Sequence, residues 1–261
     1  MKIMAAIILS IAALLFYLLW FFQGRMIFFP EKIPADYRFQ FPGLVFEEKY
    51  FQRSDAVIHT LLFRKKNPQG LVIYFHGNAG SLKSWGSIAY DWQKYNLDLL
   101  VVDYRGYGKS SGELTEKNLY LDSEAIYDSI AQGYNRKIIY GRSIGSGIAT
   151  WLAAKREVDG LLLESPLYNM EYLAQLHYPW FPVSMLRFHF RNDKRMKKLR
   201  CPVFVIHGDN DQVIPLDSSL MLSRESLTNM KLTVVRGGGH NDLSSFADYP
   251  MWLDHSLQNL L

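Results

Sequence analysis

The feature that most constrains the fold is a series of short apolar runs that alternate with longer segments of helical length. The runs are LVIYF (71–75), DLLVV (98–102), KIIY (137–140), GLLLE (160–164), PVFVIHG (202–208) and KLTVV (231–235). Strands that are apolar throughout must be covered on both faces, and helices are the usual cover. The segments with the length and composition of such helices are 83–94, 116–132, 144–156, 215–227 and 246–260. The sequence therefore predicts an α/β fold with a mostly parallel central sheet and helices on both faces.

Two further segments add to this predicted α/β fold. The alternating runs LVFEEKYF and AVIHTLLF precede the series and predict an N-terminal antiparallel hairpin. The interval 166–200 is longer than a single connecting helix and is rich in aromatic residues, so we expect a small cap insertion or a long functional loop there. The chain has 261 residues, of which 49% are hydrophobic, and this suits one domain over residues 26–261.

The N-terminal residues differ in composition from the rest. Residues 4–22, MAAIILSIAALLFYLLWFF, contain one clearly polar side chain and would span roughly 28 Å as a helix, which matches a bilayer core. A cleaved signal peptide is the alternative, but the segment ends in bulky aromatic residues without a small-x-small cleavage pattern. We expect residues 1–25 to form a single-pass transmembrane anchor in contact with membrane lipids. A short signal-anchor followed by one domain most often translocates that domain, so we expect it on the non-cytoplasmic side.

Charge and cysteine content exclude some classes of protein. The net charge of +4 is small for this length, so nucleic acid is not an expected partner. The single cysteine, Cys201, excludes an intramolecular disulfide framework and a cysteine-based zinc cluster. We expect no metal and no cofactor.

Two pentapeptides match the G-x-S-x-G template of a nucleophile elbow: GKSSG (108–112) and GRSIG (141–145). An elbow requires a strand directly before it and a helix directly after it. Ser143 has both, because KIIY precedes its pentapeptide and IGSGIATWLAAK follows. Ser110 is separated from strand 98–102 by a loop and is followed by a second loop. We therefore predict Ser143 as the nucleophile and Ser110 as a turn residue.

A serine hydroxyl needs a base, and the base needs a carboxylate that fixes its tautomer. Of seven histidines, His240 lies in the glycine-rich loop GGGHND after the last strand, from which it can reach over the sheet edge. Asp209 and Asp211 both follow strand 202–208. We prefer Asp211, because Asp209 directly follows the turn and is expected to accept hydrogen bonds from the amides of that turn.

The tetrahedral intermediate of acyl transfer also needs two backbone amides as an oxyanion hole. One usually belongs to the residue after the nucleophile, here Ile144. The other belongs to the loop HGNAG after strand 71–75, which points to Asn78.

The motifs FHGNAG, VVDYRGYGKSSG, YGRSIGSG, HGDNDQVIP and GGGHND, in this order and spacing, resemble the membrane-anchored serine hydrolases of the α/β-hydrolase superfamily. The closest likeness is to the alpha/beta hydrolase domain-containing family, from about Gln23 to the C-terminus. The resemblance implies the α/β-hydrolase fold and the same site residues: Ser143, Asp211 and His240 as the triad, and Asn78 and Ile144 as oxyanion donors. It does not define the substrate, because this fold supports many hydrolytic reactions.

We therefore expect a serine hydrolase that cleaves esters or thioesters of apolar acyl groups through an acyl-enzyme. The substrate would be a small-molecule or lipid-like acyl compound. Trp180, Phe181 and Met185 are candidates for the acyl pocket, although ordinary packing would account for each of them equally well. The alternatives are a peptidase or amidase on the same scaffold, and a catalytically idle, membrane-tethered binding module.

Overall fold

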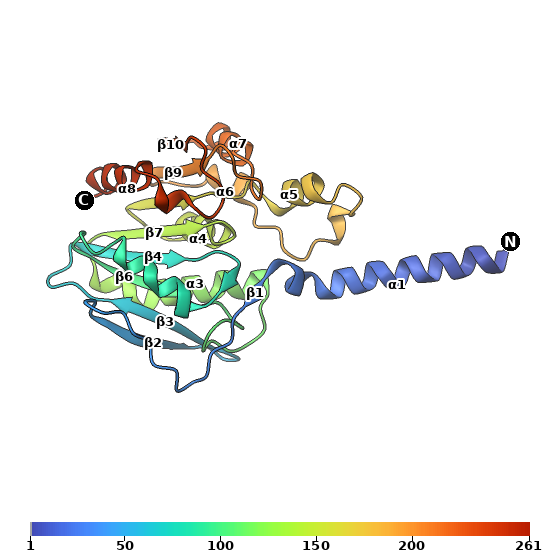
Figure 1. Cartoon of the computed structure of the whole chain (residues 1–261), viewed down its shortest axis with the longest axis horizontal. Helices are drawn as coiled ribbons and strands as arrows, with labels where there is room; N and C mark the ends of the chain where they lie inside the picture. Colours follow the sequence, from blue (N-terminus) through green and yellow to red (C-terminus); the bar gives the residue numbers. More distant parts are fainter. Residues whose placement is uncertain (1) are drawn as a thin grey trace.

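The computed structural model describes residues 2–261 and is built on an eight-stranded sheet in the order β10-β9-β8-β7-β4-β6-β3-β2 (Figure 1). The strands are β2 (Phe46–Gln52), β3 (Val57–Phe63), β4 (Gly70–Phe75), β6 (Leu97–Val102), β7 (Lys137–Arg142), β8 (Gly160–Glu164), β9 (Val203–Gly208) and β10 (Met230–Val235). Strand β3 is antiparallel to both β2 and β6, and all other neighbours in this sheet are parallel. This confirms the predicted mostly parallel sheet with an N-terminal hairpin.

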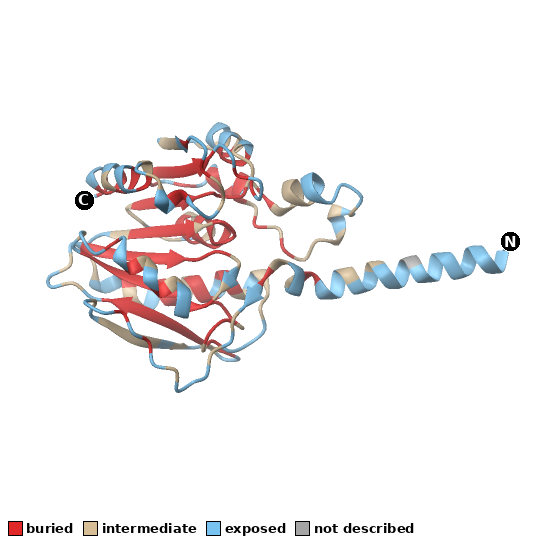
Figure 2. Ribbon diagram, viewed as in Figure 1, coloured by how far each residue is buried: buried red, intermediate tan, exposed pale blue. Residues whose placement is uncertain are grey.

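The central strands are buried along their whole length because helices cover both faces of the sheet (Figure 2). On one face, a hydrophobic cluster joins the sheet to α3 (Glu116–Ile130), α4 (Gly145–Lys155) and α7 (Asp217–Glu225). On the other face, a second cluster includes Leu82, Trp252 and Leu257, the last two from α8 (Asp248–Gln258). The α/β layers thus hold the carboxyl ends of the parallel strands at one edge.

The segment 83–94 departs from the predicted single helix. It contains the one-turn helix α2 (Leu82–Trp85), followed by the 3-10 turn η1 (Gly86–Tyr90). Gly86 lies against the ring of Phe41, and a Cβ atom there would be 2.2 Å from the Cζ atom of that ring. Glycine weakens a helix and allows this close approach, so the α-helix ends here.

Residues 166–200, which we call the insertion, connect β8 to β9. They contain α5 (Met170–His177), the 3-10 turn η3 (Val183–Met185) and α6 (Asn192–Met196). The side chain of Asn169 caps α5 by accepting a hydrogen bond from the Tyr172 amide (2.7 Å). Figure 1 shows α5 and the loop after it at the end of the domain from which the N-terminal helix projects.

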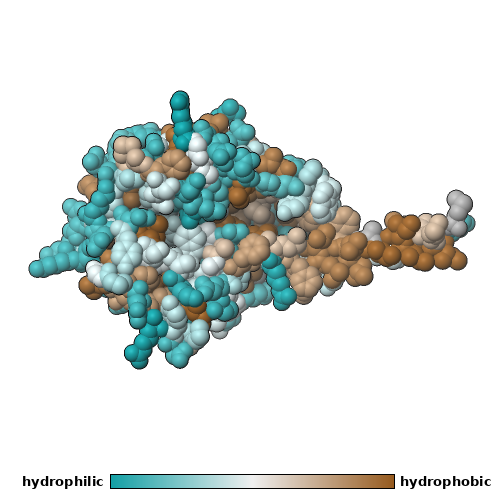
Figure 3. Space-filling view, viewed as in Figure 1, coloured by the Kyte–Doolittle hydropathy of each residue, from teal (hydrophilic) through white to brown (hydrophobic). Residues whose placement is uncertain are grey.

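That helix, α1 (Lys2–Ile27), projects away from the domain with its apolar side chains exposed (Figure 3). Its length and composition would allow it to cross a membrane, and a signal sequence would have the same properties. After α1 the chain forms β1 (Phe29–Pro30), which pairs in parallel with β5 (Ala79–Gly80). The end of α1 is thereby tied to the loop that follows β4.

Candidate active site

Ser143 lies in the sharp turn between β7 and α4 and has a φ of 54°. A positive φ is uncommon for a residue other than glycine, and it persists only where the surrounding structure enforces it. The Ser143 amide donates to the carbonyl of Glu164 (2.9 Å), which ties the turn to the end of β8. The side chain is buried except for the face that borders a cavity.

The two glycines of the turn provide the space that it needs. A Cβ atom on Gly141 would lie 2.5 Å from the Cβ atom of Ala149 in α4. A Cβ atom on Gly145 would lie 2.2 Å from the carbonyl oxygen of Phe75 at the end of β4. The close packing of helix and strand therefore requires glycine at both positions.

The structure brings the three predicted triad residues together. His240 Nε2 lies 2.9 Å from Ser143 Oγ, and His240 Nδ1 lies 2.7 Å from Asp211 Oδ2. A carboxylate only accepts hydrogen bonds, so Nδ1 carries the proton that is shared with Asp211. In the neutral ring this leaves Nε2 free to accept the hydroxyl proton of Ser143.

Asp211 is held as a carboxylate by several donors. Its Oδ1 accepts from the amides of Val213 and Ile214, both at 2.8 Å. Burial raises the pKa of Asp211, but hydrogen bonds from His207, His240 and the Ile214 amide outweigh this effect, and the pKa lies below its usual range. The carboxyl group is therefore ionised at neutral pH.

Asp209 has a different hydrogen-bond partner from the one expected. Its Oδ1 accepts a hydrogen bond from the amide of Gly237 (2.6 Å), across to the loop after β10, and not from its own turn. The two strands β9 and β10 are parallel neighbours, so their following loops lie side by side. Asp209 thus supports the loop that carries His240, whereas Asp211 contacts the imidazole directly.

Asn78 and Ile144 both line the cavity that contains Ser143. The carbonyl of Gly77 accepts a hydrogen bond from His76 Nδ1 (2.7 Å), so the N–H of the same trans peptide, that of Asn78, points the opposite way. The Ile144 amide precedes α4, where the first N–H groups of a helix have no partner within the helix. Within residues 2–261, neither amide donates a hydrogen bond to a protein group.

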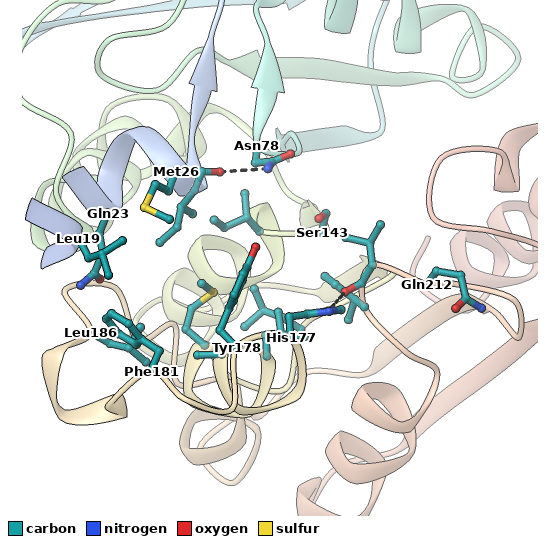
Figure 4. Close-up of a pocket in the computed structure, with 18 of the residues that line it drawn as sticks. Leu19, Gln23, Met26, Asn78, Ser143, His177, Tyr178, Phe181, Leu186 and Gln212 are labelled. Carbon is teal, nitrogen blue, oxygen red and sulfur yellow. Dashed lines mark hydrogen bonds between the residues drawn. The ribbon is translucent and has the colours of Figure 1, made fainter. Parts of the chain in front are cut away.

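The cavity beside Ser143 has a volume of about 460 Å³ (Figure 4). Its lining is largely apolar: Leu19, Gln23, Met26, Ile27, Asn78, Ser143, Ile144, Leu167, Met170, Leu173, Ala174, His177, Tyr178, Trp180, Phe181, Leu186, Gln212, Val213 and Ile214. Of the three candidate pocket residues, Trp180 and Phe181 line the cavity and Met185 does not. Met185 belongs to η3, which lies against α1, and it lines a separate pocket with Tyr17 and Trp20.

Sequence reasoning missed a buried ion pair behind the His240 loop. Arg142 pairs with Glu164 (2.8 Å), and its Nη2 donates to the carbonyl of His240 (3.2 Å). Glu164 also accepts from the hydroxyl of Tyr140 (2.5 Å). The sequence carried part of the signal, because Arg142 and Glu164 are charged residues at the carboxyl ends of two apolar strands. The register that pairs them is seen only in the structure.

Comparison with known proteins gives matches to both sequence and fold. Residues 66–191 match a family model described as serine aminopeptidase, S33. Alpha/beta hydrolase domain-containing protein 17B of Homo sapiens is 34% identical over 188 residues, which cover 70% of this chain and 64% of that protein. An uncharacterized protein of Mycobacterium tuberculosis strain H37Rv is 29% identical over 246 residues, which cover 91% of this chain and 87% of that protein.

Among solved structures, the esterase Pf2001 of Pyrococcus furiosus has a TM-score of 0.69 and 15% identity, and the match covers 90% of this chain and 97% of that one. This likeness confirms the predicted fold. The matched segment spans between 60% and 64% of the length of several curated relatives, including the human protein.

Proposed function

We propose that this chain, which has the α/β-hydrolase fold, is a serine hydrolase that cleaves esters or thioesters of apolar acyl groups. One observation carries the proposal: a strained serine at a strand–helix turn lies within hydrogen-bond distance of an imidazole that is bonded to a buried carboxylate. This is the geometry that makes a serine hydroxyl nucleophilic.

The reaction follows from the positions of these groups. The Ser143 oxygen attacks the acyl carbonyl carbon while His240 Nε2 takes the hydroxyl proton, and Asp211 stabilises the resulting imidazolium. The amides of Asn78 and Ile144 donate to the oxyanion of the tetrahedral intermediate. When the intermediate collapses, the bond to the alcohol or thiol breaks and the leaving group takes the proton from His240. Water then attacks the acyl-enzyme by the same steps and releases the acid and free Ser143.

The apolar lining of the cavity supports an apolar acyl group as the substrate class. Trp180 and Phe181 would contact that group from the insertion. We also propose that α1 anchors the protein in a membrane by a single pass, with the domain on the non-cytoplasmic side, so that lipid-like acyl substrates are the ones nearby.

An aminopeptidase is the second candidate, because the matched family model carries that description. Such an enzyme must hold the free α-ammonium group of its substrate, and a carboxylate is the usual partner for that charge. Among the described residues that line the cavity there is no aspartate or glutamate. The lining therefore favours the acyl ester or thioester.

The test is covalent labelling with a fluorophosphonate probe, which reacts with activated serines. We expect the native protein to be labelled and the Ser143→Ala variant to remain unlabelled, while Ser110→Ala is labelled at the native rate. Equal labelling of native protein and Ser143→Ala would exclude Ser143 as the nucleophile. No labelling of either would favour the idle binding module. Labelled protein that hydrolyses aminoacyl amides faster than acyl thioesters would favour the peptidase.

A further inference from the structure

The last turns of α1 form part of the wall of the cavity that contains Ser143. Leu19, Gln23, Met26 and Ile27 line it, and their spacing of i, i+4, i+7 and i+8 places them on one face of the helix. At 1.5 Å per residue, this face spans roughly 12 Å of helix. In Figure 4, Leu19 lies on the far side of the cavity from Ser143. The last turns of α1 therefore border the cavity from the Ser143 side to the far side.

The helix is held in this position by polar contacts. Gln23 is buried, and its side-chain amide donates to the carbonyl of Met185 (2.7 Å) and accepts from the amide of Arg187 (2.9 Å). At the end of the helix, Asn78 Nδ2 donates to the carbonyl of Ile27 (3.0 Å). The wall is therefore attached both to the insertion and to the residue whose backbone amide we assign to the oxyanion hole.

The insertion forms the opposite wall of the same cavity, through Leu173, Ala174, Tyr178, Phe181 and Leu186. Its tip carries apolar side chains that are exposed, and Trp180 is 61% accessible. The exposed apolar surface of α1 continues toward this end of the domain (Figure 3). An apolar chain that lies beside α1 in a lipid phase would therefore be next to the cavity.

We infer that the face of α1 formed by Leu19, Gln23, Met26 and Ile27 is part of the acyl-binding site, and that the substrate is a long-chain acyl ester or thioester whose chain extends along this helix. The inference deepens the proposed function and rests on it for the position of the acyl carbonyl at Ser143. It gives α1 a role in substrate selection in addition to any role in anchoring.

The first test compares Leu19→Trp with Leu18→Trp in the full-length protein. Leu18 is exposed and does not line the cavity, so it is the matched control. Hydrolysis of acetyl, octanoyl and myristoyl thioesters is measured in detergent. In the native protein we expect kcat/KM to rise with chain length by up to about fourfold for each methylene that is buried.

Leu19→Trp should reduce kcat/KM for the myristoyl thioester at least about tenfold, because the indole fills the far end of the cavity, and should leave the acetyl value within about twofold. Leu18→Trp should match the native protein for all three substrates. Identical chain-length profiles for the two variants would overturn the inference while leaving the proposed hydrolase intact.

A second measurement does not depend on catalysis. Met26→Cys and Leu18→Cys are each combined with Ser143→Ala, and the rate of thiol modification by N-ethylmaleimide is measured with and without myristate. We expect myristate to slow modification of Met26→Cys at least about fivefold, since a chain in the cavity covers that wall, and to leave Leu18→Cys unchanged. Equal protection at both positions would contradict the inference even if the native protein proved to hydrolyse no ester.

Discussion

The two G-x-S-x-G turns differ in which residue adopts the unusual backbone conformation. In the turn at 141–145, the positive φ falls on the serine, Ser143, and the glycines serve to make room. In the turn at 108–112, the positive φ falls on Gly108 (47°) and Gly112 (91°), where it costs little. Strain at a side chain that can react is therefore what separates the first turn from an ordinary loop.

The hydroxyl groups of Ser110 and Ser143 also differ in their hydrogen-bond partners. Ser110 Oγ accepts from the His59 amide (2.8 Å) and donates to the carbonyl of Asp103 (2.9 Å). Its donor proton and an acceptor lone pair are therefore both bonded to buried backbone groups. Ser143 Oγ bonds to His240 Nε2 and borders the cavity. A serine whose proton is bonded to a carbonyl cannot pass that proton to a base, whatever its sequence motif.

The largest expected effect concerns the carboxylate that makes the first turn reactive. Asp211→Asn should lower kcat by about 10⁴-fold, because the amide no longer selects the productive tautomer of His240. Asp209→Asn alters the acceptor for the Gly237 amide in the His240 loop, and it should lower kcat by about tenfold or less. Steady-state hydrolysis of an acyl thioester by both variants is the measurement. A greater loss in Asp209→Asn would reverse the assignment of the acid.

The next effect concerns the space that the glycines of the elbow provide. Gly145→Ala would place a methyl group 2.2 Å from the backbone oxygen of Phe75, and a backbone atom cannot move aside as a side chain can. We expect a loss of about 3 kcal/mol or more in the free energy of unfolding, with slower probe labelling, because the Ile144 amide would shift with the helix.

The control is Gly133→Ala, since a Cβ atom there would have no heavy atom within 4 Å apart from Gly133 itself and its two chain neighbours. Denaturant unfolding should detect a change of less than about 1 kcal/mol in that variant. If Gly145→Ala were as stable as Gly133→Ala, the close packing of α4 on β4 would not be what requires glycine in the elbow.

The residues before the two serines offer a matched pair of substitutions. Arg142 contacts Glu164 and the His240 carbonyl with its planar guanidinium, whereas Lys109 donates to Glu48 (2.7 Å) and to the carbonyl of Tyr37 (2.7 Å). Arg142→Lys should lower kcat by up to about 100-fold, because a single ammonium cannot reproduce both contacts and the imidazole shifts. Lys109→Arg should leave kcat within about twofold. Equal kcat values in the two variants would show that Arg142 does not position His240.

Sequence patterns were sufficient to identify the strands and the mostly parallel sheet, because buried parallel strands are continuous apolar runs. They also separated Ser143 from Ser110, through the strand before and the helix after. They did not reveal the Arg142–Glu164 pair, since each residue alone resembles a surface charge and only the register of β7 and β8 brings them together. The α1 wall was missed for a similar reason, because an apolar helix predicts a membrane anchor and carries no signal that its end will pack beside Ser143.

The smallest effect on activity is expected at the second turn. Ser110→Ala removes a buried hydroxyl and leaves the His59 amide and the Asp103 carbonyl without their partner, which should lower the free energy of unfolding by about 1–2 kcal/mol. Probe labelling should proceed at the native rate, because Ser143, His240 and Asp211 keep their contacts. Ser143→Ala is the counterpart, with no labelling and a stability close to that of the native protein. If Ser110→Ala instead slowed labelling while stability stayed unchanged, the loop after β6 would take part in the chemistry, and the contrast between a reactive and a structural serine would fail.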